Sequence, residues 1–216
     1  GATIYNLLVT YMRELYPKYG YQEVVTPQVF DVELFKKSGH YQNYHENMFF
    51  TEVDEREFGV KPMNCPGHFL MFSQQAFSYR DLPVRYADFG RLHRYERSGV
   101  TQGLTRVRTF CQDDSHIFVT LDQMAAEMDR FIELIDEVYG AFGFTDVKVG
   151  LATRPEKFMG TVENWDVAEK ALASAFERRG RPYVIHAGDG AFYGPKLDFQ
   201  VTDAIGRAWQ LGTLQV

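Results

Sequence analysis

Apolar side chains recur every three to four residues along several stretches of the chain, which is the spacing of amphipathic helices. Three local signals mark where helices begin. Thr3 and Asp31 stand at N-cap positions, and Thr120–Gln123 has the order of residues that forms a capping box. Gly20 is a stop signal for the first helix. The expected helices cover residues 3–19, 31–37, 64–78, 120–138 and 162–179.

Alternating apolar and polar positions between these helices predict strands. The expected strands cover residues 21–25, 84–96, 106–118, 145–152, 183–187, 191–202 and 207–216. Residues 40–64 are rich in His, Tyr, Asn and Phe, and we expect a hairpin or a loop there. Because consecutive strands are joined by short loops, the fold class is α+β, a mainly antiparallel sheet flanked by helices.

The composition is that of an ordinary globular protein, with 45% hydrophobic and 24% charged residues among 216, and we expect one domain. The net charge of −6 excludes a global basic field, so any nucleic-acid contact needs a local patch. Two cysteines do not make a disulfide scaffold. No apolar run spans a membrane and no leader opens the chain, so we expect a cytoplasmic location without membrane partners. Both ends fall within apparent elements, which indicates a piece of a longer protein.

The strand expected over residues 106–118 has an unusual polar face. Read with period two, this face combines anion-binding arginines, an aromatic ring, an amide, a carboxylate and an imidazole. Its residues are Arg106, Arg108, Phe110, Gln112, Asp114 and His116. A half-buried strand normally shows unremarkable polar residues on its outer face. The pattern therefore indicates a site for a phosphorylated, aromatic ligand, and the alternative is a solvated strand face.

The preceding strand adds Arg94 and Glu96 to the same region. Taken alone, these two residues fit a surface ion-pair ladder equally well. In a hairpin with Arg106 and Phe110 they favour a nucleotide site, because an arginine fork grips phosphate and a phenyl ring stacks on a base.

Cys65 and His116 are the best metal candidates. Cys65 is expected at a helix N-terminus, where the helix dipole favours the thiolate, the form that binds metals. On packing grounds alone a buried free cysteine is the commoner outcome. A structural zinc site needs four protein ligands and a catalytic one three, and His68 is a rival ligand three residues after Cys65.

Two features near the C-terminal end of the sequence also concern a site. Residues 188–196 form a glycine-rich turn, which either lets the backbone approach a ligand, with Tyr193 and Lys196 as polar contacts, or is a plain hairpin turn. Gln210 and Thr213 are three residues apart on the last strand, so in a regular strand their side chains would lie on opposite faces. They can share a site only if Gly212 allows a β-bulge.

Together these segments resemble the catalytic core of the class II aminoacyl-tRNA synthetases, most closely the threonyl family. The most specific phrases are Asn64-Cys65-Pro66-Gly67-His68 and Gln112-Asp113-Asp114-Ser115-His116. The resemblance extends over residues 1–216 as an incomplete core. It implies a third class motif, together with editing and anticodon-binding domains, that lie outside the chain.

The resemblance also implies roles for particular residues. Arg94 would hold the ATP α-phosphate and the reacting carboxylate, and Arg106 the distal phosphates, which makes these two the catalytic pair. Glu96 would orient the adenine amino group, Phe110 would stack on the ring, and Asp114 would accept from the threonine hydroxyl. The remaining ATP-site residues are Gln210 and Thr213. The remaining substrate-site residues are Met63, Gln112, Tyr193, Lys196 and Gln215.

The activity implied is that of a threonine–tRNA ligase acting on ATP, L-threonine and tRNA(Thr). Mg²⁺ would accompany ATP, and zinc would be held by Cys65, His116 and a third ligand beyond Val216. Residues 3–27 would form a homodimer interface. The alternative is an inactive synthetase-like module that binds nucleotide or amino acid, or regulates. A serine, proline or glycine enzyme of the same class is disfavoured by the paired Cys65 and His116 phrases.

Overall fold

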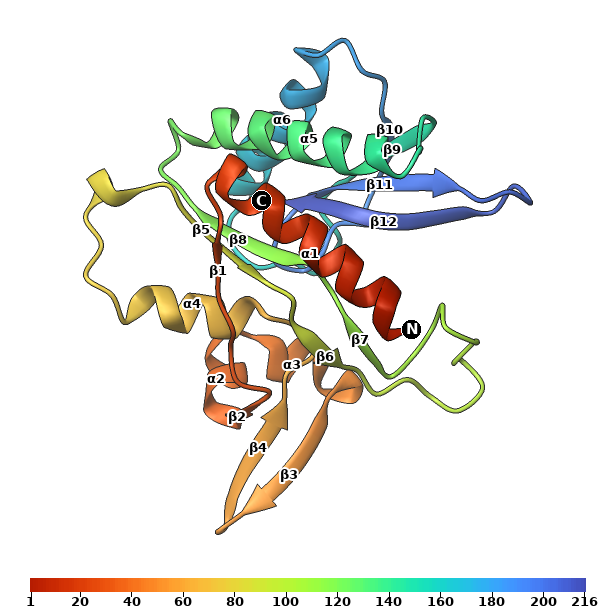
Figure 1. Cartoon of the computed structure of the whole chain (residues 1–216). Coiled ribbons are helices and arrows are strands. Elements are labelled where there is room, and N and C mark those ends of the chain that lie inside the picture. The colour runs from red at the N-terminus through yellow and green to blue at the C-terminus, as the bar shows by residue number, and fades with distance from the viewer. The chain divides into compact units, whose positions relative to one another are not determined.

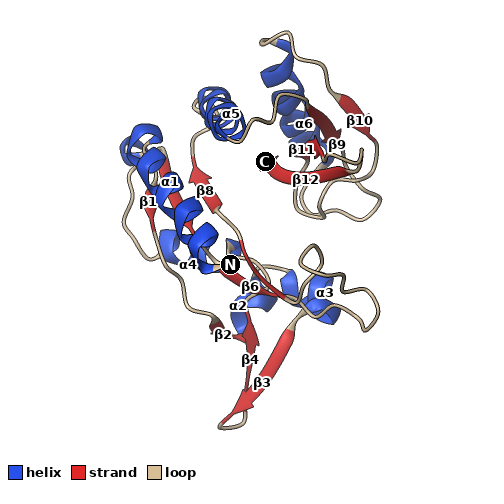
Figure 2. Cartoon of the chain, turned by 45° about the vertical axis from the view of Figure 1, so that its right-hand side comes forward, coloured by secondary structure: helices blue, strands red, loops and turns tan.

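A computed structural model describes all 216 residues, which form two compact units, Gly1–Thr120 and Leu121–Val216 (Figure 1). Each unit has its own sheets and helices, coloured by type in Figure 2. Most strand pairs are antiparallel, so the α+β class predicted from the sequence is confirmed. No helix combines the length and the apolar character needed to cross a membrane.

The helices of the first unit begin and end largely where the sequence signals stand. They are α1 (Ala2–Tyr19), α2 (Val32–Lys37), α3 (His40–Tyr44) and α4 (Cys65–Ser73), with single 3₁₀ turns at His45–Asn47 and Tyr79–Asp81. Gly20 ends α1 in the left-handed conformation, with φ 76°. Asp31 caps α2 by accepting from the Glu33 N–H at 2.9 Å.

Two helix boundaries differ from the prediction. Thr3 is not the N-cap of α1, because the helix begins one residue earlier and Gly1 occupies the cap position. Helix α4 ends at Ser73 and not at Ser78. The physical reason is that Ser78 forms a capping box with Asp81, which starts a separate 3₁₀ turn and so excludes Ser78 from the preceding helix.

The strands of the first unit form three small sheets of order β1-β5-β8, β2-β4-β3 and β6-β7. They are β1 (Gln22–Glu23), β2 (Val29–Asp31), β3 (Phe49–Val53), β4 (Arg56–Val60), β5 (Val84–Asp88), β6 (Arg91–His93), β7 (Thr109–Cys111) and β8 (Asp114–Phe118). The hairpin expected within residues 40–64 is β3–β4. Its turn residues Asp54 and Glu55 both have positive φ, as tight hairpin turns require.

The two long strands predicted over residues 84–96 and 106–118 are each interrupted. The outer halves pair as β5 with β8, placing Tyr86 opposite His116, and the inner halves pair as β6 with β7, placing Leu92 opposite Phe110. The interruption falls at Gly90, where a Cβ would lie 2.3 Å from the Asn64 amide. The close approach of Asn64 explains both the glycine and the break in the strand.

The second unit packs two helices on a four-stranded sheet of order β10-β9-β11-β12 (Figure 1). Its elements are α5 (Met124–Ala141), β9 (Val147–Ala152), α6 (Val162–Glu177), β10 (Val184–His186), β11 (Lys196–Thr202) and β12 (Ala208–Gln215). The core between helices and sheet includes Ile132, Leu172, Phe176 and Phe199, all fully buried. Both helices therefore pack an apolar face on the sheet, as the spacing of their apolar residues predicts.

The start predicted for the helix at Thr120–Gln123 differs from the structure. Residues 121–123 form a turn, and α5 starts only at Met124 with Gln123 in the cap position. The Gln123 side chain makes no capping hydrogen bond.

Candidate functional site

The first cluster of predicted site residues centres on Arg94, which directly follows β6. Its guanidinium carbon lies 5.0 Å from the centre of the Phe110 ring on β7 and 5.8 Å from that of Tyr44. Its Nε donates to the Pro62 carbonyl at 3.1 Å. Its backbone N–H donates to the Arg108 carbonyl at 2.9 Å, which continues the β6–β7 pairing. Since none of these partners is a carboxylate, the positive charge of Arg94 remains available to an anion.

Glu96 and Arg106 form the second part of this cluster. Arg106 Nη2 lies 3.0 Å from the Glu96 carboxylate. Arg108 donates two hydrogen bonds to the Glu96 carbonyl, at 3.0 and 2.7 Å. Glu96 is buried, whereas the Arg106 side chain is 59% exposed. The structure thus brings together the four residues Arg94, Glu96, Arg106 and Phe110, with more positive than negative charge among them and Arg108.

Cys65 opens α4 and belongs to a neighbouring cluster with Asp114 of β8. Asn64, the cap residue of α4, donates to Asp114 Oδ2 at 3.0 Å. Burial raises the pKa of the Cys65 thiol to about 12, and the negative charge of Asp114 acts in the same direction. Burial and Asp114 thus act against the thiolate form that we expected at this helix N-terminus.

His116, two residues after Asp114 on β8, contacts His68 of α4. The two Nδ1 atoms are 2.7 Å apart. Burial lowers the pKa of His116; Asp114 opposes this shift and His68 reinforces it. The imidazole is thereby favoured in its neutral form, which is the form that binds metals. Asp114 acts on the pKa of both Cys65 and His116, so all three share one electrostatic environment.

The donors of this cluster suit zinc in kind but are too few by themselves. Cys65 is a free cysteine, and His116 retains Nε2 beside its Nδ1 contact to His68. A thiol and an imidazole fit two zinc positions, yet a zinc site takes at least three protein ligands. No three His, Cys, Asp or Glu side chains are arranged to hold a metal ion. His68, the rival ligand, is completely buried between His116 and Asp88, behind His116 and not beside it.

Two further predicted residues flank this cluster. Gln112 lies between β7 and β8, and its N–H donates to the Gly90 carbonyl at 3.2 Å, so it bridges the interruption in both strands. Met63 lies between β4 and α4, half-buried and two residues before Cys65.

In the second unit, Asp198 of β11 joins three of the predicted residues. Lys196 Nζ is 2.8 Å from Asp198 Oδ2. Gln210 Nε2 donates to Asp198 Oδ1 at 2.7 Å and to Thr213 Oγ1 at 2.8 Å, and Thr213 Oγ1 donates to Asp198 Oδ1 at 3.3 Å. Asp198 was missed by the sequence reasoning. A signal existed, because Asp198 and Lys196 occupy alternate positions of one strand and so share a face.

The bulge required for Gln210 and Thr213 to share a face is present. The β11–β12 register pairs Phe199 with Gly212 and then Gln200 with Gln210, which leaves Leu211 unpaired. A Cβ on Gly212 would lie 2.6 Å from the Tyr139 hydroxyl, so the bulge is packed tightly against α5.

The glycine-rich segment 188–196 is not a hairpin turn. Strands β10 and β11 lie on opposite sides of β9 and do not pair with each other. The glycine is needed at Gly194, where a Cβ would lie 2.0 Å from the Val216 carbonyl oxygen. Tyr193 is partly exposed beside it, and Gln215 is the register partner of Lys196.

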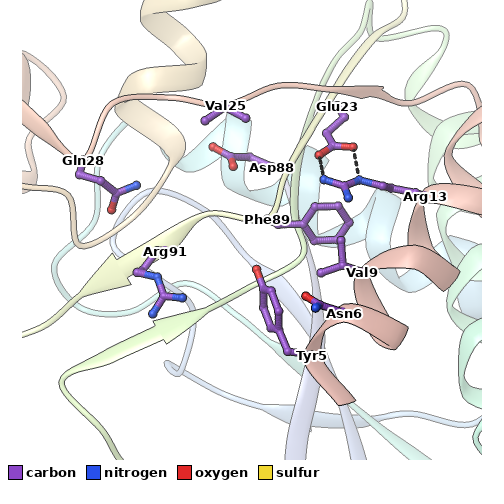
Figure 3. A pocket seen from close by; sticks show the side chains of 10 residues that line it. All are labelled: Tyr5, Asn6, Val9, Arg13, Glu23, Val25, Gln28, Asp88, Phe89 and Arg91. Atoms are coloured by element: carbon purple, nitrogen blue, oxygen red, sulfur yellow. Dashed lines mark hydrogen bonds and ion pairs between the residues drawn. The ribbon is translucent and has the colours of Figure 1, made fainter. Parts of the chain in front are cut away.

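A cavity of about 380 Å³ in the first unit does not coincide with the predicted site (Figure 3). It is lined by Tyr5, Asn6, Val9, Arg13, Glu23, Val25, Gln28, Asp88, Phe89 and Arg91. Its clearest polar feature is a paired contact from Arg13 to Glu23, at 2.7 and 2.6 Å. None of the predicted site residues lines this cavity, so the candidate site residues all lie outside it.

Known proteins resemble this chain along its whole length. It is 61% identical to the threonine–tRNA ligase of Bdellovibrio bacteriovorus and 54% identical to a probable cytoplasmic threonine–tRNA ligase of Encephalitozoon cuniculi. Both alignments cover 100% of this chain and 33% of the relative. The chain thus spans about a third of the length of these relatives.

Solved structures show the same likeness. A crystal structure described as the RNA-binding domain of threonyl-tRNA synthetase from Cryptosporidium parvum superposes with a TM-score of 0.97 at 49% identity, covering 100% of this chain and 54% of that one. A putative threonyl-tRNA synthetase from Aeropyrum pernix gives 0.82 at 37% identity, covering 93% and 48%. The model of one protein family, tRNA synthetase class II core domain (G, H, P, S and T), matches residues 49–216. With this match, the chain belongs to the class II core domain family of tRNA synthetases.

Proposed function

We propose that the chain is the amino-acid-activating core of a threonine–tRNA ligase. Such an enzyme joins L-threonine to ATP as threonyl-adenylate, releases pyrophosphate, and transfers the threonyl group to the 3′ end of tRNA(Thr). The observation that carries the proposal is the placement of two complementary clusters on successive strands. Arg94 and Phe110 form a nucleotide-type cluster at β6–β7, and Cys65, Asp114 and His116 form a donor-rich cluster at α4–β8. The names of the relatives support the same activity.

In the proposed mechanism the protein positions reactants and stabilises charge. Arg94, with no carboxylate opposing it, holds the α-phosphate and the threonine carboxylate that attacks it. Phe110 supports the adenine ring and Glu96 accepts from its amino group. Arg106, which extends into solvent from Glu96, holds the distal phosphates. Mg²⁺ bound with ATP would neutralise part of the phosphate charge.

The amino-acid side of the proposed site uses the second cluster. Asp114 accepts a hydrogen bond from the threonine hydroxyl, and Gln112 and Met63 border the substrate. A zinc ion on Cys65, His116 and a further ligand would supply a Lewis acid that selects an amino acid with both amino and hydroxyl donors. A site that demands the hydroxyl rejects valine strongly, whereas serine lacks only a methyl group, worth about 1–3 kcal/mol.

The second unit contributes the remaining proposed contacts. Gln210 and Thr213 complete the ATP site, and Tyr193, Lys196 and Gln215 the substrate site. Asp198 supports this proposal because its buried carboxylate fixes Lys196, Gln210 and Thr213 in one group.

We also propose a homodimer through residues 3–27. Large apolar side chains of α1 are exposed there, among them Ile4 and Leu7 at 65% each, and Val25 after β1 is 84% exposed. Such a surface is typical of a protein interface. A cytoplasmic location is proposed as well, in line with the name of the Encephalitozoon cuniculi relative.

The test is ATP–pyrophosphate exchange with threonine, serine, valine or no amino acid. We expect exchange with threonine, weaker exchange with serine and none with valine. The assay is run on residues 1–216 and on the full-length protein in parallel. Exchange in neither protein, with ATP binding that is unaffected by threonine, would overturn the ligase and favour a synthetase-like binding module.

A further inference from the structure

A buried polar network lies directly behind His116. Asp88 of β5 is its centre and is 3% exposed, and Lys61 and His68 around it are 1% and 0% exposed. Thr26 Oγ1 donates to Asp88 Oδ2 at 3.1 Å and accepts from Lys61 Nζ at 2.8 Å. Lys61 Nζ lies 3.6 Å from the same carboxylate oxygen. Burial favours the protonated acid, but contacts from His68, Lys61 and Thr26 outweigh it, so the pKa of Asp88 lies below its usual value and the group is a carboxylate.

His68 connects this carboxylate to His116. His68 Nε2 is buried, makes no closer hydrogen bond, and faces Asp88 Oδ2 at 3.5 Å. A carboxylate can only accept, so this arrangement favours a proton on Nε2 of His68. Neutral His68 then carries its lone pair on Nδ1, which lies 2.7 Å from Nδ1 of His116. One of the two Nδ1 atoms must donate, and the remaining choice is His116.

We propose that Asp88 and His68 are positioning residues that hold His116 in the tautomer with its proton on Nδ1 and its lone pair on Nε2. The order of donation is His116 Nδ1–H to His68 Nδ1, and His68 Nε2–H to Asp88. His116 then presents Nε2 as a metal donor with its ring orientation fixed. Metal-binding histidines commonly depend on such a partner at the other ring nitrogen.

The network also explains why a buried charge is retained at this position. Lys61 compensates Asp88, and the same segment anchors the proposed nucleotide site, because the Lys61 and Pro62 carbonyls accept from His93 N–H and Arg94 Nε at 3.1 Å each. Orientation of His116 and placement of Arg94 therefore rest on one buried framework. Asn64, also fully buried, links this framework to Asp114.

The first experiment requires no metal. Nitrogen-15 NMR of histidine-labelled residues 1–216, recorded above neutral pH, distinguishes the two neutral tautomers of each ring. We expect His116 to carry its proton on Nδ1 and His68 on Nε2. In His68→Asn the amide oxygen can replace Nδ1 as acceptor, so the His116 tautomer should persist. In His68→Leu it should be lost. A His116 proton on Nε2 in the unsubstituted chain would overturn the proposal.

The second experiment concerns zinc and therefore rests on the proposed function. Zinc affinity of the full-length protein is measured by chelator competition, and the electronic spectrum of the Co²⁺-substituted protein reports ligand geometry. His68→Leu should weaken zinc binding about 10- to 100-fold and shift the Co²⁺ bands, with His68→Asn restoring both. His40→Leu is the matched control, since His40 is also buried and its Nδ1 contacts Ser38 Oγ at 2.9 Å.

The outcomes separate the two ideas. If zinc binding requires Cys65, tested as Cys65→Ser, but is the same in His68→Leu as in His40→Leu, the positioning role is overturned while the metal site stands. If the unsubstituted protein binds no zinc and Cys65→Ser changes nothing, the proposed metal site fails. The NMR result would still decide whether His68 sets the tautomer of His116.

Discussion

At the scale of single residues, the surroundings of Arg94 differ from those of an ordinary surface arginine, so its contribution to activity can be tested against one. Its guanidinium is placed by Phe110, Tyr44 and the Pro62 carbonyl, none of which neutralises it. Arg97, three residues later, is 80% exposed and pairs only with the equally exposed Glu46. Exposed ion pairs of this kind contribute little to stability.

Arg94→Ala should therefore raise the barrier to threonine activation by about 2.7–4 kcal/mol, the range for losing a donor to a developing charge. The measurement is kcat/KM for pyrophosphate exchange in the full-length protein. Arg97→Ala is the matched control and should stay close to the unsubstituted rate. Equal rates for the two variants would contradict the role proposed for Arg94.

Cys65 gives a prediction of pH dependence. Thiols are alkylated as thiolates, and burial with Asp114 raises the pKa of Cys65 to about 12. In Cys111→Ser, where Cys65 is the sole thiol, the iodoacetamide rate at neutral pH should be low. The rate should continue to increase as the pH is raised above the ordinary thiol pKa of about 8.5. The folded thiol holds its proton more firmly than the unfolded one, so its stabilising contribution is present below the unfolded pKa and is lost between about 8.5 and 12. A rate that levels off near the ordinary pKa would refute this environment.

Residue types were readable from the sequence, but their surroundings were not. Alternation in the two strands correctly grouped Arg94, Arg106 and Phe110, because neighbouring strands of a hairpin bring those positions together. The raised pKa of Cys65 was not visible in the sequence, since Asp114 and the segments that bury the thiol are distant in sequence. Asp88 was missed because its partners Thr26, Lys61 and His68 are distant in sequence, whereas Asp198 could have been found from its alternation with Lys196.

At the scale of elements, the β12 bulge shows how one irregularity arranges a site. Core periodicity predicted α5, α6 and β9 well, because each has a continuous apolar face. Element ends were less predictable, as the turn before α5 and the early end of α4 show. These ends depend on local competition between capping groups. The sequence showed only that a bulge was required for Gln210 and Thr213 to share a face. The tight contact of Gly212 with Tyr139 was not visible in the sequence.

That contact yields a prediction of coupled stability. Gly212→Ala should destabilise the second unit by about 1–3 kcal/mol, as overpacking does. Tyr139→Phe removes the hydroxyl that the new methyl group would meet, and this hydroxyl is buried without a hydrogen bond. The single Tyr139→Phe variant should therefore be neutral or more stable, and the double variant should recover most of the loss. Urea unfolding of all four proteins measures the coupling, and strict additivity would argue against the contact.

At the scale of the whole molecule, the two units differ in how they are built. The first contains small sheets and a buried polar network around Asp88. The second has one continuous hydrophobic core, and every residue of that core lies within Leu121–Val216. A segment with its own core has the main requirement for independent folding.

Residues 121–216 should accordingly fold alone. The expected result is a cooperative urea transition with a slope of about 1–3 kcal/mol per molar, and dispersed NMR signals. Ile132→Ala, at a fully buried position of that core, should lower the free energy of unfolding by about 2–5 kcal/mol. A broad transition that is insensitive to Ile132→Ala would show that the second unit depends on the first.

Gln210 illustrates what the Asp198 group means for molecular recognition. Its amide has two N–H bonds, and both are committed, one to Asp198 and one to Thr213. These two contacts fix the orientation of the amide, because rotation would place its oxygen against the Asp198 carboxylate. Gln210 can therefore offer a ligand only a hydrogen-bond acceptor, its amide oxygen. A ligand atom that contacts Gln210 must therefore be a hydrogen-bond donor. An exocyclic amine can form this hydrogen bond, whereas a carbonyl oxygen cannot.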